Sequence, residues 1–264
     1  MQTRGEGQMY WGFIGGTGFY TLDQQQQPER ITTPFGEAVL YRVPVSGQEV
    51  AFLPRHGIEH NLPPHLINYR ANIWALRSLG VQRVLATASV GTCNPGLEPG
   101  SLALLAQFLD FTKGRPCTLY QEGGPVLHVD VTEPYCPQLR QELAEAAAAL
   151  GRWVHPGATY VCTEGPRFET AAEISMFGHL GADVVGMTGV PEVVLAREAG
   201  LCYACLAVAT NWAAGVGGRP LSHQEVCDEM ANQIADIKAI FARVVAQHQP
   251  RPCPCSPQNG AGDG

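Results

Sequence analysis

Residues 158–192 read ATYVCTEGPRFETAAEISMFGHLGADVVGMTGVPE and contain the clearest structural pattern of the chain. Within them we predict two strands, Ala158–Thr163 and Asp183–Met187, because both are short apolar runs bounded by polar or glycine residues. A polar segment that contains glycine follows each run: Glu164–Glu169 after the first and Gly186–Glu192 at the end of the second. Open α/β sheets bind ligands at the carboxyl ends of their strands, so this stretch predicts a site at that edge.

Strands and helices alternate on both sides of this stretch. The other predicted strands are Tyr10–Ile14, Val50–Leu53, Arg83–Ser89, Ala103–Leu109 and Leu201–Thr210. Apolar residues at helical spacing predict helices at His65–Leu79 and Pro137–Leu150. A last helix begins with the capping box Ser222–Glu225, which places His223 in the first helical turn. This alternation predicts an α/β fold with a mostly parallel sheet covered by helices.

Composition and charge restrict the classes of protein that fit. With 264 residues, 45% of them hydrophobic and 16% charged, the chain is long enough for one large domain, predicted at residues 1–249 and followed by a flexible tail at 250–264. A formal charge of −7 argues against a nucleic-acid or anionic-membrane surface. Neither a signal-peptide apolar segment nor a membrane-length apolar run is visible, which predicts a soluble, cytoplasmic protein.

Three of the nine cysteines are predicted to be reduced thiols. Cys162, Cys202 and Cys205 lie in apolar runs, where cysteine usually behaves as a small hydrophobic residue. Cys202 and Cys205 have CxxC spacing but lack a second pair, which disfavours a zinc or redox site. The pair Cys253-Pro-Cys255 lies in the predicted tail, where we expect both thiols to be exposed and a disulfide between them to be an open alternative.

Two segments near the amino-terminal half could bind an anion. Ile14–Gly18 follows a predicted strand, and its backbone N–H groups and the Thr17 hydroxyl could converge on phosphate, although a simple tight turn fits equally well. The segment lacks the lysine of a P-loop and the spacing of a dinucleotide fingerprint. Arg55 and His56 come directly after strand Val50–Leu53, where a guanidinium and an imidazole could clamp phosphate oxygens. A surface arginine beside a capping histidine is the alternative.

Polar residues also follow other predicted strands. Asn211 comes at the end of strand Leu201–Thr210, where asparagine is uncommon unless a turn or a ligand uses its amide. Glu169 and Glu192 follow the two strands described first. Either glutamate could instead begin a helix, since the helix dipole favours a carboxylate there.

Together these motifs resemble those of the trimeric purine nucleoside phosphorylase and methylthioadenosine phosphorylase family. The segments that carry the resemblance, in order, are GGTG, RHGxxH, NYRANIWAL, EPYCP, EGPRFET, GMTGVPE, LAREAGLCYA and TNWAAG, and they extend from about Phe13 to Val245. The resemblance implies a single domain with a central mixed sheet flanked by helices. It also implies a homotrimer, with a hexamer as the alternative, a site near a subunit interface, and no metal or cofactor, with orthophosphate as co-substrate. Cys253 and Cys255 resemble C-terminal CxC pairs of some thermophilic phosphorylases.

The same resemblance assigns the site residues. The phosphate site comprises Thr17, Arg55, His56, Ala88 through its backbone, Ser89 and Thr188. Met187 lies under the ribose, and the histidines near the 5′ side are His60, His223 and His128, the last donated by the neighbouring subunit. The segment Thr87–Ser89 departs somewhat from the family pattern.

Two positions point to a 6-oxopurine base. Relatives that cleave adenine nucleosides resemble an Asp-x-Asp pattern where this chain has Asn211-Trp212-Ala213. An amide donates to a 6-oxo group while its carbonyl accepts from N7–H. Glu169, next to Phe168 in the base site, matches relatives that act on 6-oxopurines, in which it accepts from N1–H. We therefore predict phosphorolysis of inosine or guanosine, with Asn211, Glu169 and His56 as catalytic residues.

Three alternatives are retained. S-methyl-5′-thioinosine phosphorylase shares the same base recognition and the sequence Met187–Glu192, whereas His223 favours a 5′-hydroxyl. S-methyl-5′-thioadenosine phosphorylase fits less well because of Asn211. A non-catalytic nucleotide-binding module built on GGTG is disfavoured, since the predicted phosphate ligands come from several strand ends.

Overall fold

The computed structural model describes residues 9–16, 27–57, 59, 61–120, 126–218, 222–249, 253 and 255. Its strands are β1 (Trp11–Gly15), β2 (Glu29–Thr33), β3 (Gly36–Val45), β4 (Gln48–Pro54), β5 (Arg83–Thr92), β6 (Leu102–Phe111), β7 (Val154–Thr163), β8 (Val184–Gly186) and β9 (Cys202–Trp212). Its helices are α1 (Tyr69–Ser78), α2 (Pro137–Ala149), α3 (Ala171–His179), α4 (Gly189–Glu198) and α5 (His223–Gln247), with the 3₁₀ turn η1 at Pro64–Leu66.

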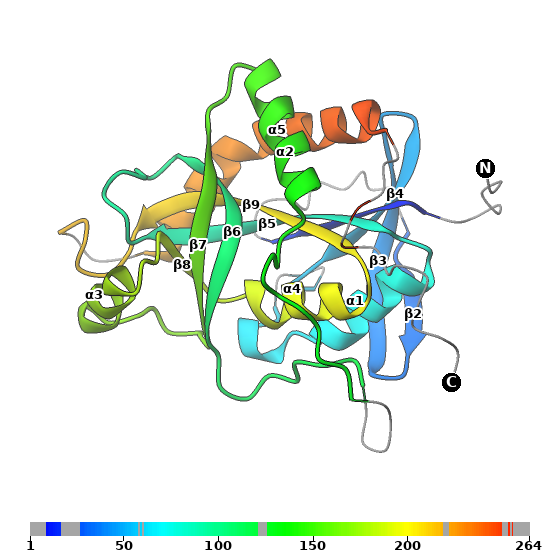
Figure 1. The fold of residues 1–264 in the computed structure, drawn as a ribbon, viewed down its shortest axis with the longest axis horizontal. Helices are drawn as coiled ribbons and strands as arrows, with labels where there is room; N and C mark the ends of the chain where they lie inside the picture. The colour runs from blue at the N-terminus through cyan, green and yellow to red at the C-terminus, as the bar shows by residue number, and fades with distance from the viewer. Residues whose placement is uncertain are drawn as a thin grey trace.

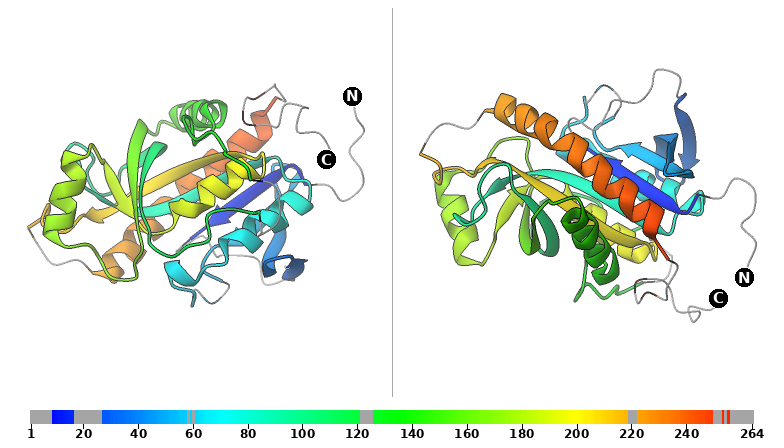
Figure 2. Two further views of the ribbon diagram at one scale, coloured as in Figure 1. Left: turned by 60° about the horizontal axis from the view of Figure 1, so that its bottom comes forward. Right: turned by 90° about the horizontal axis from the view of Figure 1, so that it is seen from above.

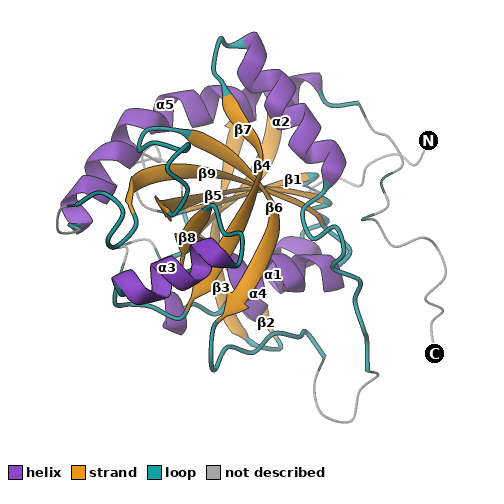
Figure 3. Ribbon diagram, turned by 60° about the vertical axis from the view of Figure 1, so that its left-hand side comes forward, coloured by secondary structure: helices purple, strands orange, loops and turns teal. Residues whose placement is uncertain are grey.

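The strands form one nine-stranded sheet in the order β2-β3-β4-β1-β5-β8-β7-β6-β9. Strand β9 pairs with both β6 and β5, so β5, β8, β7, β6 and β9 close into a ring (Figure 3). Parallel pairs such as β1–β5 and β5–β9 coexist with antiparallel pairs such as β5–β8 and β6–β9. The sheet is therefore mixed, as the resemblance implied, and among the described strands parallel pairings outnumber antiparallel ones.

Helices cover the sheet on two sides. In Figure 1, α2 and α5 lie above the sheet and α1 and α4 lie below it, and Figure 2 shows α5 running along one face. Two clusters of buried side chains fill these layers, one around Ile73 and Val193 and the other around Leu139 and Phe241. None of the described helices has the combination of length and apolarity that crossing a bilayer requires.

Two predicted features of the amino-terminal half were wrong. The helix predicted from His65 begins at Tyr69, because the Asn68 side chain accepts from Ala71 N–H at 3.1 Å and caps the helix there. Strands β2 and β3 were missed. A two-residue turn at Ser46-Gly47, with φ of 49° and 77°, joins β3 to β4 and was the available hairpin signal.

Helices α3 and α4 were not predicted, although a helix beginning at Glu169 or Glu192 was retained as an alternative. Helix α3 carries a complete capping box, in which Thr170 and Glu173 satisfy each other's backbone N–H groups. Seven of the ten residues of helix α4 are buried, and a helix that is mostly buried shows little helical period in its sequence.

Candidate active site

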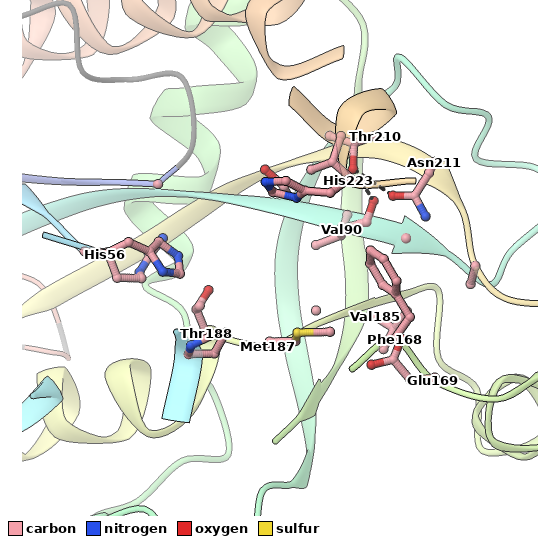
Figure 4. Close-up of a pocket in the computed structure, with 18 residues that line it drawn as sticks. His56, Val90, Phe168, Glu169, Val185, Met187, Thr188, Thr210, Asn211 and His223 are labelled. Atoms are coloured by element: carbon pink, nitrogen blue, oxygen red, sulfur yellow. Dashed lines mark hydrogen bonds between the residues drawn. The ribbon is translucent and has the colours of Figure 1, made fainter. Parts of the chain in front are cut away.

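One pocket collects most of the predicted site residues at the carboxyl ends of the strands. The pocket is open to solvent, and its empty volume, with the solvent at its mouth included, is about 790 Å³. The predicted residues that line it are Arg55, His56, Ser89, Phe168, Glu169, Met187, Thr188, Asn211 and His223. Figure 4 shows His56 and Thr188 at one end, Asn211, Phe168 and Glu169 at the other, and Met187 between them.

Of the other four predicted residues, two are described but do not line the pocket with their side chains, and two lie outside the described residues. Ala88 has its methyl group in the core, so only its backbone is left for the predicted contact. His128 is exposed and does not line this pocket. Thr17 and His60 lie outside the described residues. The described chain therefore brings together the two ends of the predicted site, and the predicted role of His128 still requires a second subunit.

Arg55 is held in the pocket wall by a buried ion pair. Its Nε and Nη2 donate to the two carboxylate oxygens of Glu192, each at 2.7 Å, and its Nη1 donates to the Thr87 carbonyl at 2.7 Å. Glu192 also accepts from the Tyr203 hydroxyl at 2.7 Å. A guanidinium has five N–H donors, so donors remain on Arg55 for an anion in the pocket.

The electrostatics of this ion pair keep Arg55 charged. Burial alone would lower the pKa of the Arg55 guanidinium, but the Glu192 carboxylate outweighs burial and holds that pKa above its usual value. Burial raises the pKa of the Tyr203 phenol well above its usual value, so this hydroxyl stays a donor to Glu192. The alternative that Glu192 merely begins a helix is incomplete, because its carboxylate positions Arg55.

His56 and Thr188 complete the polar end. The Nδ1 atom of His56 lies 2.8 Å from the Leu62 carbonyl, which can only accept, so Nδ1 carries a proton and the ring is fixed. Thr188 is the N-cap of α4, yet its side chain makes no capping hydrogen bond. Instead, the Tyr160 hydroxyl accepts from the backbone N–H groups of Thr188 and Gly189 at 3.1 and 3.2 Å. The Thr188 hydroxyl is therefore not used by its own helix.

Steric crowding explains why glycine occupies both ends of the GMTG segment. A Cβ at Gly186 or Gly189 would lie 2.7 Å from atoms of the Tyr160 side chain, which is too close for any other residue. Gly165, with φ of 66°, has its Cβ position 2.7 Å from the Met187 Sδ atom. These glycines allow the two strand-end segments to approach, and Met187 becomes the floor between the two ends of the pocket.

Arg115 joins these segments and was not predicted. It is buried, and its Nη1 donates to the carbonyls of Met187 and Val190 at 2.8 and 2.7 Å. Its Nη2 donates to the carbonyls of Glu164 and Thr163 at 2.8 and 3.2 Å. One guanidinium therefore satisfies the backbone at the ends of both strands, and no local sequence pattern around Arg115 indicates this role.

Asn211 has a defined orientation at the other end. Its Nδ2 donates to the Trp212 carbonyl and its Oδ1 accepts from the Thr210 hydroxyl, both at 2.9 Å. Because a carbonyl only accepts, these contacts settle which amide atom is which. Each atom uses one of its two hydrogen-bonding positions, so one N–H donor and one acceptor position remain for a ligand.

Glu169 lies at the same end, and its carboxylate is also positioned. The Thr163 hydroxyl at the end of β7 donates to Glu169 Oε1 at 2.6 Å. Only 9% of Glu169 and 8% of Asn211 are exposed, whereas Phe168 is 40% exposed at the mouth. A planar ligand that offers an acceptor to the Asn211 amide and an N–H donor to the Glu169 carboxylate would match these two side chains.

His223 reaches the pocket from α5, where it is the first helical residue as predicted. Ser222 caps the helix by accepting from Glu225 N–H at 3.2 Å. The Nε2 atom of His223 lies 3.5 Å from the Cys227 thiol one turn later. The imidazole is exposed and lines the upper side of the pocket in Figure 4, between the two ends.

The fold and this pocket define an α/β protein whose site has a guanidinium, an imidazole and a hydroxyl at one end and an amide and a carboxylate at the other. The family described as the phosphorylase superfamily matches residues 11–246, and the chain belongs to this family. This result confirms the resemblance and the single-domain α/β fold that it implied.

Relatives cover nearly the whole chain. The 6-oxopurine nucleoside phosphorylase of Pyrococcus furiosus is 50% identical over 250 residues, which cover 92% of this chain and 94% of the relative. A probable S-methyl-5′-thioinosine phosphorylase of Methanopyrus kandleri is 51% identical, covering 93% and 95%. Among solved structures, the methylthioadenosine phosphorylase of Schistosoma mansoni in complex with tubercidin has a TM-score of 0.85 at 35% identity, covering 90% of this chain and 91% of that chain.

Proposed function

We propose that this enzyme cleaves 6-oxopurine ribonucleosides, inosine and guanosine, with orthophosphate to give the free base and ribose 1-phosphate. The observation that carries the proposal is the pairing of Asn211 and Glu169 at one end of a pocket whose other end holds Arg55. Relatives of about 50% identity named 6-oxopurine nucleoside phosphorylase support it.

The proposed chemistry uses position and charge. Phosphate, held by Arg55, His56 and Thr188, attacks C1′ of the ribose while the bond from C1′ to the purine nitrogen breaks. The bonding electrons pass to the purine, whose N7 takes a proton from a solvent water at the open mouth of the pocket and then donates a hydrogen bond to Asn211 Oδ1. The bound phosphate dianion stabilises the ribosyl cation as it forms, and no protein nucleophile and no metal take part in the chemistry.

Base selection follows from the remaining hydrogen-bonding positions. Asn211 Nδ2 donates to the 6-oxo group, and Glu169 accepts from N1–H. Adenine presents an amine donor and an unprotonated N1 at these positions, which leaves buried groups unpaired. At about 1–3 kcal/mol for each mismatch, the two together give roughly 10²- to 10⁴-fold discrimination.

One assay tests this function. The purified enzyme is incubated with inosine in the presence and absence of phosphate, and hypoxanthine and ribose 1-phosphate are quantified. We expect both products to form only with phosphate. Base release that does not depend on phosphate would indicate a hydrolase, and nucleoside binding without release would indicate a binding module.

The second candidate function is cleavage of S-methyl-5′-thioinosine, supported by the relative from Methanopyrus kandleri. The two functions differ at the 5′ group, near which we place His223. An imidazole pairs with a 5′-hydroxyl, whereas a thioether offers only a weak acceptor. We therefore propose the ribonucleoside as the preferred substrate.

Replacing His223 by leucine is expected to reverse this preference. Loss of the hydrogen bond to the 5′-hydroxyl should lower kcat/KM for inosine by about 10-fold, and the apolar side chain should raise kcat/KM for the methylthio analogue. The ratio of the two kcat/KM values is the measurement, with His179→Leu on α3 as a control. A wild-type enzyme that strongly prefers the thioether would contradict the proposal.

We also propose that the enzyme is a homotrimer. Val126 and Leu127, next to His128, are 83% and 45% exposed, and a neighbouring subunit that covers them would support the predicted donation of His128 to its site. Light scattering should give a mass of about three times 28.4 kDa. Val126→Asp should dissociate the assembly and lower activity, and a monomeric active wild-type enzyme would contradict this. The cytoplasmic location remains a prediction.

A further inference from the structure

Four thiols from separate segments of the chain meet in the folded protein. The Sγ atoms of Cys136, Cys202, Cys253 and Cys255 all lie within 4.8 Å of one another, and all four residues are buried. Cys253 and Cys255 are 9% and 7% exposed, so the prediction that this pair is exposed was wrong. The cluster joins three remote segments: the start of α2, the start of β9 and the residues after α5.

The arrangement of the sulfur atoms suits a shared metal ion. Cys136 Sγ and Cys253 Sγ lie 3.4 Å apart, whereas a disulfide requires about 2.05 Å. Four thiolates at about 2.3 Å from a tetrahedral zinc ion lie about 3.8 Å from one another. All nine cysteines are free in the structure, so no pair in the cluster is already joined. Mutual convergence of four sulfurs is what a tetrahedral site needs, whereas two disulfides require only pairwise contacts.

Two neighbouring features, the start of α2 and Arg83, bring positive charge to the cluster. Cys136 is the N-cap of α2, and its Sγ accepts from Leu139 N–H at 3.5 Å, where the helix dipole stabilises a negative charge. The Cys136 backbone N–H donates to the Tyr203 carbonyl at 2.8 Å, which fixes α2 beside Cys202. The buried Arg83 is the register partner of Cys202 on the neighbouring strand and supplies a nearby positive charge.

The CxxC spacing does not describe this site. Side chains alternate along a strand, so Cys202 and Cys205, three residues apart, point to opposite faces of β9. Cys202 belongs to the cluster of buried residues under α2 and α5, and Cys205 belongs to the cluster on the other side of the sheet. The partners of Cys202 instead come from segments far away in the sequence.

We propose that Cys136, Cys202, Cys253 and Cys255 bind one structural zinc ion, which attaches the carboxyl-terminal segment to the body of the enzyme. Zinc is the divalent ion that best fits four thiolates in a closed tetrahedral site. Cys202 and Asn211 lie at opposite ends of β9, nine residues and about 30 Å apart, so the ion is remote from the pocket and takes no part in the reaction. This proposal does not depend on the nature of the substrate.

Metal content of the full-length enzyme tests the proposal. Untagged protein, purified without chelator and without added reductant, is expected to contain one zinc ion per chain by elemental analysis. Native mass spectrometry should show the same ion, and the unreduced, denatured chain should have the mass of nine free thiols. Substitution with Co²⁺ should produce the absorption bands of tetrahedral thiolate coordination.

Paired variants separate zinc binding from general effects of cysteine replacement. The double variant Cys253→Ser/Cys255→Ser should lose the zinc ion and lower Tm by roughly 10 °C. Cys117→Ser, at an exposed thiol outside the cluster, should keep the ion and the Tm. Wild-type metal content decides the question even if the double variant does not fold.

Two results would overturn the proposal. One is a metal-free chain whose unreduced mass is lower by two hydrogens for each bond, which shows disulfides in the cluster. The other is a reduced chain with all thiols free that takes up no zinc when it is titrated with ZnCl₂.

Discussion

Replacing Asn211 by aspartate is expected to lower kcat/KM for inosine by about 10²-fold and to raise kcat/KM for adenosine. A carboxylate has no donor for the 6-oxo group, but it accepts from both the adenine amine and a protonated N7. The loss of one buried hydrogen bond to the substrate and the resulting repulsion account for about 2–3 kcal/mol. The measurement is the ratio of kcat/KM for inosine to that for adenosine, which should fall in the variant.

The Asn211→Asp substitution should also destabilise the enzyme. Asn211 Nδ2 donates to the Trp212 carbonyl, and an aspartate would place an acceptor against that carbonyl. We therefore expect Tm to fall by several degrees, which corresponds to about 1–3 kcal/mol in the free energy of unfolding. Asn211→Leu is the control, since it should lose activity on inosine without gaining activity on adenosine. An unchanged substrate ratio in Asn211→Asp would remove the basis of the proposed base recognition.

Replacing Glu192 by glutamine is expected to raise KM for phosphate at least 10-fold and to destabilise the enzyme. Glu192 is 1% exposed and holds both Nε and Nη2 of Arg55. Removing one charge of a buried pair leaves the other uncompensated, at about 3–5 kcal/mol, which lowers Tm by roughly 10 °C. Phosphate binding weakens because the guanidinium is no longer fixed by two hydrogen bonds. KM for inosine should change much less than KM for phosphate.

Two control variants distinguish positioning from general stability. Glu49→Gln removes the same charge from an exposed pair with Arg42 and should change Tm by at most a few degrees. The double variant Arg55→Met/Glu192→Leu replaces the buried pair by apolar residues and should recover most of the stability without recovering phosphate binding. If Glu192→Gln kept the wild-type KM for phosphate, Glu192 would have only a structural role.

Elements marked by patterns over a few neighbouring residues were predicted correctly from the sequence. Strands β1, β4, β5, β6, β7, β8 and β9 were predicted from apolar runs of strand length, and α2 and α5 from helical spacing and capping residues. The pocket residues at the ends of these strands were predicted because a polar segment directly after a buried strand marks the edge of an α/β sheet. Arg55, Glu169 and Asn211 were found in this way, whereas Met187 was assigned from the family resemblance, and all four line the pocket.

Other features depend on contacts that no local pattern records. Glu192 meets Arg55 across 137 residues, and Cys253 meets Cys136 across 117. Helix α4 is mostly buried and therefore shows little helical period, and Arg115 makes its contacts with backbone carbonyls, which carry no signal in side-chain identity. The sequence therefore specifies which side chains lie at strand ends, because apolar runs and alternating patterns extend over only a few residues. Which of those groups pair, and which thiols converge, depends on chain segments that meet only when the sheet closes and the helices pack on it.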